Sequence, residues 1–221
     1  MISSLSKTRV AFQGERGAFS EDAAMKLLGP DIELVPRPTF AALFTSLDDE
    51  LADFVLSPIE NSLIGSIHPA VELLNASSLV VAGEVIIQIR QQLIGCPGSV
   101  FEEIKAVESH PAALAQCKRF FAEHPLVDRI ETEDTAGSVA RVIERGDRTR
   151  AAIAGRRAAE LYGGSIIKES LEDHPDNYTR FVLLSSKQSI GQSPNRISSQ
   201  RSRPTDNNQH TETLKEEVFK S

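Results

Sequence analysis

Residues 79–96, LVVAGEVIIQIRQQLIGC, form an extended and largely apolar stretch that decides how the fold is organised. An ordinary strand spans about 5–6 residues, so this stretch is too long to be a single strand. A run of this kind can cross from one lobe of a protein to another. The stretch is therefore a candidate for a connection between two lobes.

Strands and helices are expected to alternate on both sides of this stretch. Short apolar segments are separated by helical patterns with capping residues and closing glycines. Alternation at this spacing indicates βαβ units, and hence an α/β fold with a largely parallel sheet. The strands expected outside the stretch are residues 8–13, 53–61, 106–107, 128–132, 151–154, 166–169 and 178–184.

Some local features of these elements are specific enough to test. Ser20 is expected to be the N-cap of the first helix, and Ser109 the N-cap of a helix over residues 111–123. Pro58 is expected to break the strand over residues 53–61, because proline cannot donate to a strand ladder.

Composition limits the classes of function. The 221 residues are 40% hydrophobic and 25% charged, which is ordinary for a globular protein. A net charge of −7 and a pI near 5.3 argue against a nucleic-acid partner or a basic membrane-binding face. The N-terminal residues lack the apolar core of a signal peptide, and no apolar run approaches the ~18 residues of a spanning helix. We expect a soluble, cytoplasmic protein.

The two cysteines, Cys96 and Cys117, fit no CxxC or zinc-ligand spacing, so a metal site is not expected and both are predicted to be reduced core thiols.

The composition of the chain changes after residue 186. Residues 187–221 are rich in Ser, Gln, Asn and Arg, and they hold too few apolar side chains to offset the entropy of ordering. We expect a disordered polar tail there, with the folded part over residues 8–186.

Glu60 and Asn61 follow Pro58 at the end of a strand, in the segment SPIENSLIGSIH over residues 57–68. One interpretation is ordinary turn chemistry with a solvated carboxylate. The other is a carboxylate and an amide presented at the carboxyl end of a strand, where open α/β sheets bind ligands. In VESHPAALAQC, residues 107–117, Gln116 is either an exposed glutamine or an amide that faces a cleft.

Helix starts offer further candidates. Asp134 or Thr135 caps a helix with small residues in its first turn, and the free N–H groups at such an end suit a carboxylate ligand. The same holds for the loop from Gly14 to Ser20. Neither matches a nucleotide-binding glycine fingerprint.

Taken in order, these segments resemble the catalytic domain of prephenate dehydratase over residues 9–186. The segments that carry the resemblance are FQGERGAFSEDAA (12–24), PIENSLIGSIHPAVELL (58–74), GEVIIQIRQQLIG (83–95), ESHPAALAQC (108–117), DTAG (134–137), GRRAAELYG (155–163) and NYTRFVLL (177–184).

The resemblance implies a two-lobed fold like that of type II periplasmic binding proteins, with the active site in the inter-lobe cleft. Lobe 1 would comprise residues 8–88 and 178–186, and lobe 2 residues 89–177. The implied activity is that of a carbon–oxygen lyase without metal or organic cofactor. Prephenate loses water and carbon dioxide to give phenylpyruvate in phenylalanine biosynthesis. A small-molecule substrate and a homo-oligomer, in particular a homodimer, are implied as well.

The family's site residues fall, position by position, on Glu60, Asn61, Ser109, Gln116, Thr179, Arg180 and Phe181. Thr179 would contact the leaving hydroxyl, and Glu60 could be the ultimate acid. Asn61 is expected to be catalytic as well. The residues expected to bind substrate are Ser109, Gln116, Arg180 and Phe181, together with Ser20 and Thr135 at the helix starts.

The chain also departs from the family pattern. Ala112 and Ala18 stand where many members have glutamine and threonine, and the polar C-terminal segment is too short to form the regulatory ACT domain that many members carry. Two alternatives stay open. One is arogenate dehydratase, whose substrate has an amino group in place of the side-chain keto group. The other is a non-catalytic module that binds small anions.

Overall fold

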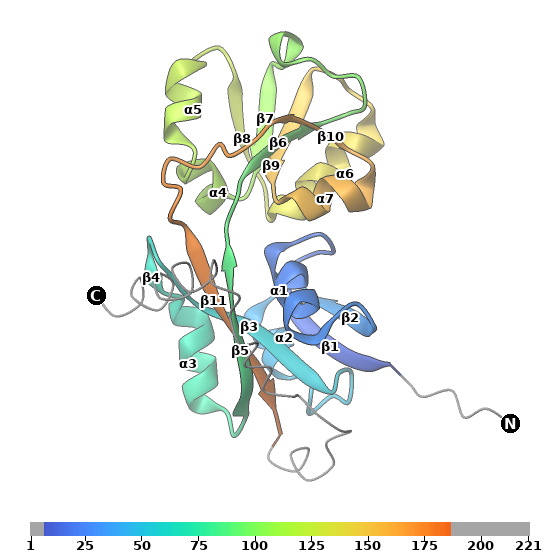
Figure 1. Cartoon of the computed structure of the whole chain (residues 1–221), viewed down its shortest axis with the longest axis vertical. Coiled ribbons are helices and arrows are strands. Elements are labelled where there is room, and N and C mark those ends of the chain that lie inside the picture. Colours follow the sequence, from blue (N-terminus) through green and yellow to red (C-terminus); the bar gives the residue numbers. More distant parts are fainter. Residues whose placement is uncertain (1–6, 187–221) are drawn as a thin grey trace, which may run out of the picture.

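The computed structural model describes residues 7–186, which form two lobes placed one above the other (Figure 1). The first lobe holds one mixed sheet with strand order β2-β1-β3-β11-β5, and β4 pairs with β3 at one end. Its strands are β1 (Thr8–Gln13), β2 (Ile32–Arg37), β3 (Phe54–Asn61), β4 (Gly65–Ser66), β5 (Val80–Gln88) and β11 (Tyr178–Ser185). Its helices are α1 (Phe19–Leu28), α2 (Phe40–Phe44) and α3 (His68–Ala76).

The second lobe is built around a sheet with strand order β10-β6-β9-β7-β8. Its strands are β6 (Gln92–Gly95), β7 (Ala106–Ser109), β8 (Asp128–Glu131), β9 (Arg150–Ala154) and β10 (Ser165–Lys168). Its helices are the short 3₁₀ turn η1 (Phe101–Glu103), α4 (Pro111–Ala115), α5 (Lys118–Glu123), α6 (Thr135–Arg145) and α7 (Arg156–Tyr162). The α/β class and the two-lobed architecture are confirmed. The tail expected to be disordered, residues 187–221, lies outside the described residues.

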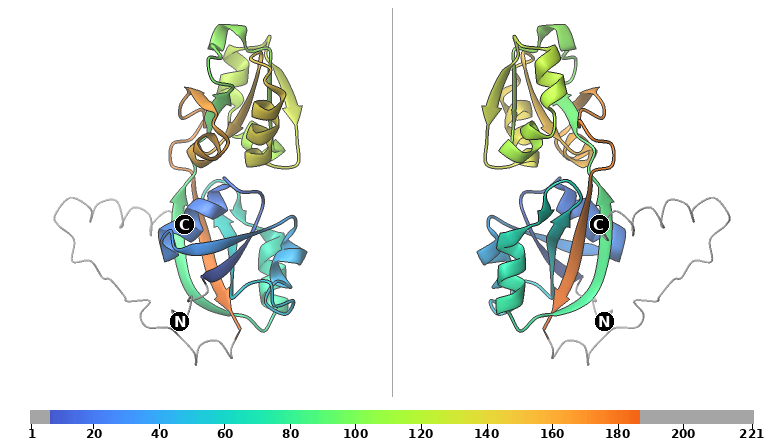
Figure 2. Two further views of the ribbon diagram at one scale, coloured as in Figure 1. Left: turned by 90° about the vertical axis from the view of Figure 1, so that its right-hand side faces the viewer. Right: turned by 90° about the vertical axis from the view of Figure 1, so that its left-hand side faces the viewer.

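The long apolar stretch does cross between the lobes. β5 ends in the first sheet at Gln88, and β6 begins in the second sheet at Gln92. Within the described part of the chain, the backbone returns once, into β11, and the two connections lie side by side (Figure 2). There the Ile89 N–H donates to the Asn177 carbonyl oxygen over 2.8 Å. Two adjacent strands therefore carry the covalent link between the lobes.

The sheets are mixed, so the expectation of a largely parallel sheet is wrong. β1 runs parallel to β2 and β3, but β11 runs antiparallel to both β3 and β5. In the second lobe β7 runs parallel to β8 and β9, whereas β6 is antiparallel to β9 and β10. The strands that arrive from the other lobe, β6 and β11, are not placed by a βαβ crossover, and they supply the antiparallel pairs.

Two prolines account for two differences from expectation in the first sheet. β2 was not among the expected strands; it pairs with β1 as an edge strand, where the proline in IELVPR is tolerated. Pro58 does not break β3, which continues to Asn61. Instead β3 bulges. Arg180 pairs with Glu60 and Phe181 pairs with Pro58, so Ile59 has no partner across the strand pair.

The helix expected over residues 111–123 is two helices, α4 and α5. The second begins after Cys117, and the Asp173 carboxylate accepts from the backbone N–H groups of Lys118 and Arg119, each over 2.9 Å. A capping carboxylate from a distant segment therefore starts a new helix where the sequence pattern reads as continuous.

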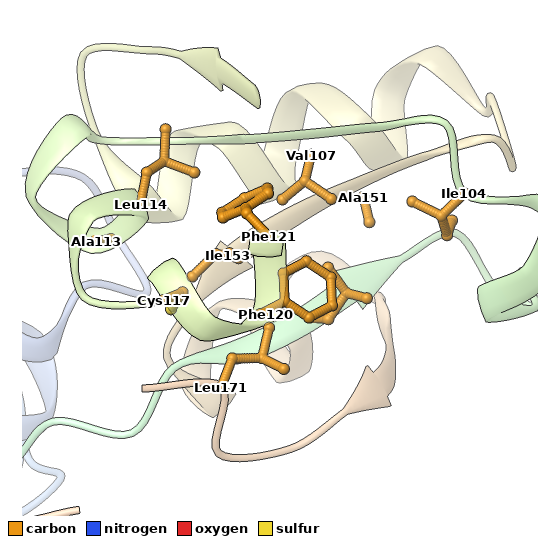
Figure 3. Close-up of a cluster of buried hydrophobic side chains, with 11 residues drawn as sticks. Ile104, Val107, Ala113, Leu114, Cys117, Phe120, Phe121, Ala151, Ile153 and Leu171 are labelled. Atoms are coloured by element: carbon orange, nitrogen blue, oxygen red, sulfur yellow. The ribbon is translucent and has the colours of Figure 1, made fainter. Parts of the chain in front are cut away.

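One core cluster of the second lobe packs between α4, α5 and the sheet (Figure 3), and another packs between the sheet and helices α6 and α7. Cys117 lies in the first cluster, fully buried beside side chains such as Leu114 and Phe121. Cys96 is also buried, and both thiols are free, as predicted. Burial raises the pKa of the Cys117 thiol to about 12, far above that of an exposed cysteine.

The lobes also touch directly, away from the two connections. Arg157 of α7 pairs with Asp22 and lies 3.7 Å from the Glu21 carboxylate of α1. The Tyr162 hydroxyl donates to the Arg16 carbonyl oxygen over 2.9 Å.

Glu21 is buried at this contact, and its carboxylate is satisfied within its own lobe. It accepts from the Arg16 side chain over 2.8 Å and from the Gly17 N–H over 2.9 Å. Burial alone would raise the pKa of the Glu21 carboxyl, but these hydrogen bonds and the nearby guanidinium groups outweigh it and lower the pKa below its ordinary value.

We predict that iodoacetamide at about pH 8 leaves Cys117 unmodified in the folded protein, because only the thiolate reacts and its population is negligible at that pH. The same reagent should modify Cys117 fully in urea. Peptide mass spectrometry after each treatment measures this. Labelling of Cys117 in the folded state at the rate of a free thiol would contradict the burial described.

We predict that Glu21→Gln lowers the free energy of unfolding near neutral pH by about 1–3 kcal/mol. The substitution replaces the buried carboxylate by a neutral amide, so the charge-assisted hydrogen bonds from Arg16 and Gly17 are lost or weakened. The folded-state pKa is lowered, so this stabilisation is present above the unfolded pKa of about 4.3 and is lost as pH falls through the folded value. Urea unfolding at neutral and acid pH measures it. Glu144→Gln, exposed on α6, is the control, and an equal deficit at both pH values would refute the assignment.

Candidate active site

The paired ends of β3 and β11 hold a buried cluster of polar side chains. Asn61 and Thr179 are direct partners in the strand register. The Asn61 Nδ2 group donates to Thr179 Oγ1 over 2.9 Å and to Asn177 Oδ1 over 2.8 Å, while its Oδ1 accepts from the Leu63 N–H over 3.0 Å. These bonds fix the orientation of the Asn61 amide.

This geometry sets the role of the Thr179 hydroxyl. A hydroxyl has one donor hydrogen and two acceptor lone pairs. Because Thr179 Oγ1 accepts from the Asn61 amide, its hydrogen is directed toward a different acceptor. Thr179 is 7% exposed and lines a pocket, so that acceptor can belong to a bound molecule.

The pocket lies between the lobes and has a volume of about 210 Å³. Both lobes and one connection contribute to its wall. It is lined by Phe19, Pro58, Asn61, Ile64, Ile67, Thr179 and Phe181 from the first lobe, Ile89 and Gln91 from the connection, and His110, Ala112, Ala113, Gln116 and Thr135 from the second lobe. Apart from the imidazole of His110, this lining has no ionisable side chain.

A second pocket of about 210 Å³ adjoins the first and shares Phe19, His110 and Thr135 with it. Its remaining lining is Gln13, Gly14, Glu15, Ala18, Ser20, Glu133 and Asp134. The cleft therefore has a neutral amide- and hydroxyl-lined end and an end with three carboxylates. We refer to the pocket that contains Thr179 as the Thr179 pocket.

The sequence-predicted residues divide between these places. Asn61, Gln116, Thr135, Thr179 and Phe181 line the Thr179 pocket. Ser20 lines only the second pocket.

Glu60 and Arg180 lie elsewhere. The Arg180 Nη2 and Glu60 Oε2 atoms are 3.1 Å apart, and neither residue lines either pocket. Successive residues of a strand point to opposite faces, so Arg180 faces away from the side that Thr179 and Phe181 share. The geometry therefore gives no support to Glu60 as a direct proton donor in this pocket.

Ser109 is also outside the pocket lining. It is the last residue of β7, it is fully buried, and its hydroxyl donates to the Ile153 carbonyl oxygen over 2.6 Å. The N-cap of α4 is His110, whose Nδ1 accepts from the Ala112 N–H over 3.2 Å, so the expected capping role of Ser109 is wrong. β7 runs two residues further than the expected strand over residues 106–107, and it takes Ser109 into the sheet.

The remaining two cap expectations have different outcomes. α1 begins at Phe19 after Ala18, so Ser20 is inside the helix and is not its N-cap; the Ser20 hydroxyl donates to the Gln13 carbonyl oxygen over 3.2 Å. In α6 the cap is Asp134, whose carboxylate accepts from the Gly137 N–H. Thr135 is the first residue of that helix and lines both pockets.

Several lining residues were not among the predicted ones. Gln91 is 2% exposed, and its Nε2 donates to Gln116 Oε1 over 3.1 Å. His110 lines both pockets, and Phe19 lies between them. A run of polar residues at 90–92 inside an apolar crossing stretch was the available signal for Gln91. Residues 7–186 contain no group of three or more His, Cys, Asp or Glu side chains that could hold a metal ion.

No helix in the described part of the chain has the length and apolar character needed to cross a membrane; α6, for example, has 11 residues.

Comparison with known proteins places these features in a family. The model of the family described as prephenate dehydratase matches residues 10–189. The arogenate dehydratase/prephenate dehydratase 2 of Arabidopsis thaliana, a chloroplastic protein, is 40% identical over 183 residues, which cover 83% of this chain and 48% of that protein. This chain thus spans about half the length of this curated relative.

Two solved structures are similar over most of this chain. Prephenate dehydratase from Arthrobacter aurescens, in complex with L-Phe, is 30% identical with a TM-score of 0.73, covering 81% of this chain and 60% of that one. GqqA, described as a novel type of quorum quenching acylase, is 32% identical with a TM-score of 0.71, covering 85% of this chain and 65% of that one. The family match spans nearly all of both lobes, and the chain belongs to the prephenate dehydratase family.

Proposed function

We propose that the chain is a carbon–oxygen lyase that catalyses the decarboxylating dehydration of prephenate to phenylpyruvate, or of arogenate to phenylalanine. Family membership supports the reaction, and relatives 40–42% identical are named arogenate dehydratases or arogenate dehydratase/prephenate dehydratases. The observation that carries the proposal is the hydrogen bond from Asn61 to Thr179 Oγ1 on the pocket wall.

The reaction needs a proton for its leaving group. The electron pair of the bond between the ring and its carboxylate moves into the ring, carbon dioxide departs, and the ring hydroxyl leaves as water after it gains a proton. Thr179 donates its hydrogen bond to the departing oxygen, where negative charge develops. Because Asn61 holds the Thr179 oxygen, this donor is oriented before the substrate arrives.

His110 is the imidazole among the residues that line this pocket, and imidazole is the side chain that most often acts as a general acid in enzymes. Its Nδ1 accepts a backbone N–H, so Nε2 is the nitrogen that bears the transferable proton. We assign His110 the supply of the proton, in place of Glu60.

The acylase activity of a similar structure is less well supported by this pocket. Acyl transfer through an enzyme nucleophile needs a hydroxyl or thiol that donates to an adjacent base. Thr179 instead accepts from an amide, and the lining contains no serine or cysteine. Thr135 supplies the other hydroxyl of the lining, but within the described residues its hydroxyl forms no hydrogen bond with His110. A non-catalytic binding module would need no such oriented donor.

A homo-oligomer and a cytoplasmic location, both expected from the sequence, remain part of the proposal. Light scattering of the purified protein measures the first, and cell fractionation the second.

Incubating the purified chain with prephenate and with arogenate, and separating the products by chromatography, tests the reaction. Phenylpyruvate from the first or phenylalanine from the second is the expected result. If the protein consumes neither prephenate nor arogenate faster than each reacts without enzyme, the proposal is refuted.

We predict that Thr179→Ala lowers kcat by about 10²–10⁴-fold, the usual range for a positioned proton-transfer group. KM should change far less, because the interaction is made mainly in the transition state. Thr179→Ser keeps the hydroxyl and should retain much more activity. Steady-state kinetics and circular dichroism of both variants measure this. If the alanine variant turns over near the wild-type rate, Thr179 is structural.

A further inference from the structure

Gln91 lines the Thr179 pocket and carries a buried acceptor that has no partner among the described residues. The side chain is 2% exposed, and its Oε1 accepts no hydrogen bond from any group in the described part of the chain. Its Nε2 donates to Gln116 Oε1 over 3.1 Å. A buried carbonyl left unsatisfied is costly, so a donor from a bound molecule would be favoured at this position.

The backbone of Gln91 is held firmly. Its N–H donates to Glu172 Oε2 over 2.8 Å, and its carbonyl oxygen accepts from the Leu171 N–H over 2.8 Å. Glu172 is itself buried and pairs with Arg90 over 3.1 Å. These contacts fix Gln91 at the point where the chain passes between the lobes.

The segment over residues 171–173, which contacts the backbone of Gln91, also contacts Gln116. The Gln116 carbonyl oxygen accepts from the Asp173 N–H over 2.7 Å, and the Asp173 carboxylate caps α5 directly after it. Residues 171–173 therefore anchor both glutamines. Both side chains line the Thr179 pocket, and Gln91 Oε1 is a buried acceptor of this pair that lacks a donor among the described residues.

An acceptor in the pocket distinguishes the two candidate substrates. Prephenate has one neutral donor, the ring hydroxyl, which the proposed function places at Thr179; its keto oxygen and carboxylates only accept. Arogenate has an amino group in place of the keto group, and that group donates. A keto oxygen opposite Gln91 Oε1 would bring two acceptors together.

We propose that Gln91 is a specificity-determining residue whose Oε1 accepts from the side-chain amino group of arogenate, so that the site prefers arogenate to prephenate. This inference rests on the proposed function. A site built to bond a donor discriminates strongly against an analogue that lacks it.

The test compares kcat/KM for both substrates in wild type and in Gln91→Met, which keeps the length of the side chain and removes the acceptor. Wild type should prefer arogenate. Gln91→Met should lower kcat/KM for arogenate by about 10–100-fold, the range for a lost hydrogen bond to a charged group. The value for prephenate should change less than about threefold, because prephenate makes no bond to Gln91.

Gln92→Met is the matched control. Gln92 is the neighbouring buried glutamine, 4% exposed, and its Oε1 also has no partner among the described residues. It lies in β6 outside the lining of both pockets, so its replacement should leave the substrate ratio unchanged. Gln91→Glu, which keeps an acceptor, should retain the preference for arogenate if Gln91→Met fails to fold.

An equal loss for both substrates in Gln91→Met, or a wild-type preference for prephenate, would overturn the assignment. Failure of the proposed function gives a different result, in which wild type turns over neither compound. Gln91 is then tested by calorimetry with phenylalanine and phenylpyruvate, which differ by the same amino-for-keto exchange. Wild type should bind phenylalanine more tightly and Gln91→Met should lose this preference; equal binding by wild type would reject the assignment.

Discussion

The hydrogen bonds of the Asn61 amide organise the candidate active site. One Nδ2 group joins the end of β3 to two side chains of the returning segment, Asn177 and Thr179, which are more than a hundred residues away along the chain. Without this group the Asn177 carbonyl and the Thr179 hydroxyl would be buried polar atoms that lack a fixed donor. The same bonds tie the first lobe to the start of β11, where the chain leaves the second lobe.

The β3 bulge decides which side chains reach the cleft. Leu56 packs with α1 and Pro58 lines the Thr179 pocket, so regular alternation would place Glu60 on the pocket side and Asn61 away from it. The extra residue, Ile59, packs on the opposite face with α2 and α3 and reverses the alternation. Asn61 therefore enters the pocket, while Glu60 pairs with Arg180 outside it. The result is a pocket whose polar groups are amides, hydroxyls and the imidazole of His110.

The sequence predicted the crossing at residues 79–96 because an apolar run of that length fits no single strand, and it predicted Asn61, Gln116 and Thr179 through the motif that they share with a family. The sequence could not predict that Glu60 lies outside the lining of the Thr179 pocket, because the bulge that turns this side chain away depends on the pairing of β3 with β11. Gln91 was not predicted as a pocket residue for a related reason. Its place in the pocket depends on contacts with Gln116 and with residues 171–173, which only the tertiary structure brings to it.

The position of β11 has a consequence for how the chain acquires its structure. This strand lies between β3 and β5, and within residues 7–186 it is the only strand that pairs with β5. During synthesis, the first 88 residues leave the ribosome without the strand that completes their sheet, while the second lobe has all of its own strands once residue 168 has emerged. Contacts that join such distant segments also form slowly. The N-terminal lobe is therefore synthesised first and completes its folding last. Until β11 pairs with β3 and β5, the unpaired edges of these two strands are exposed and can associate with other chains.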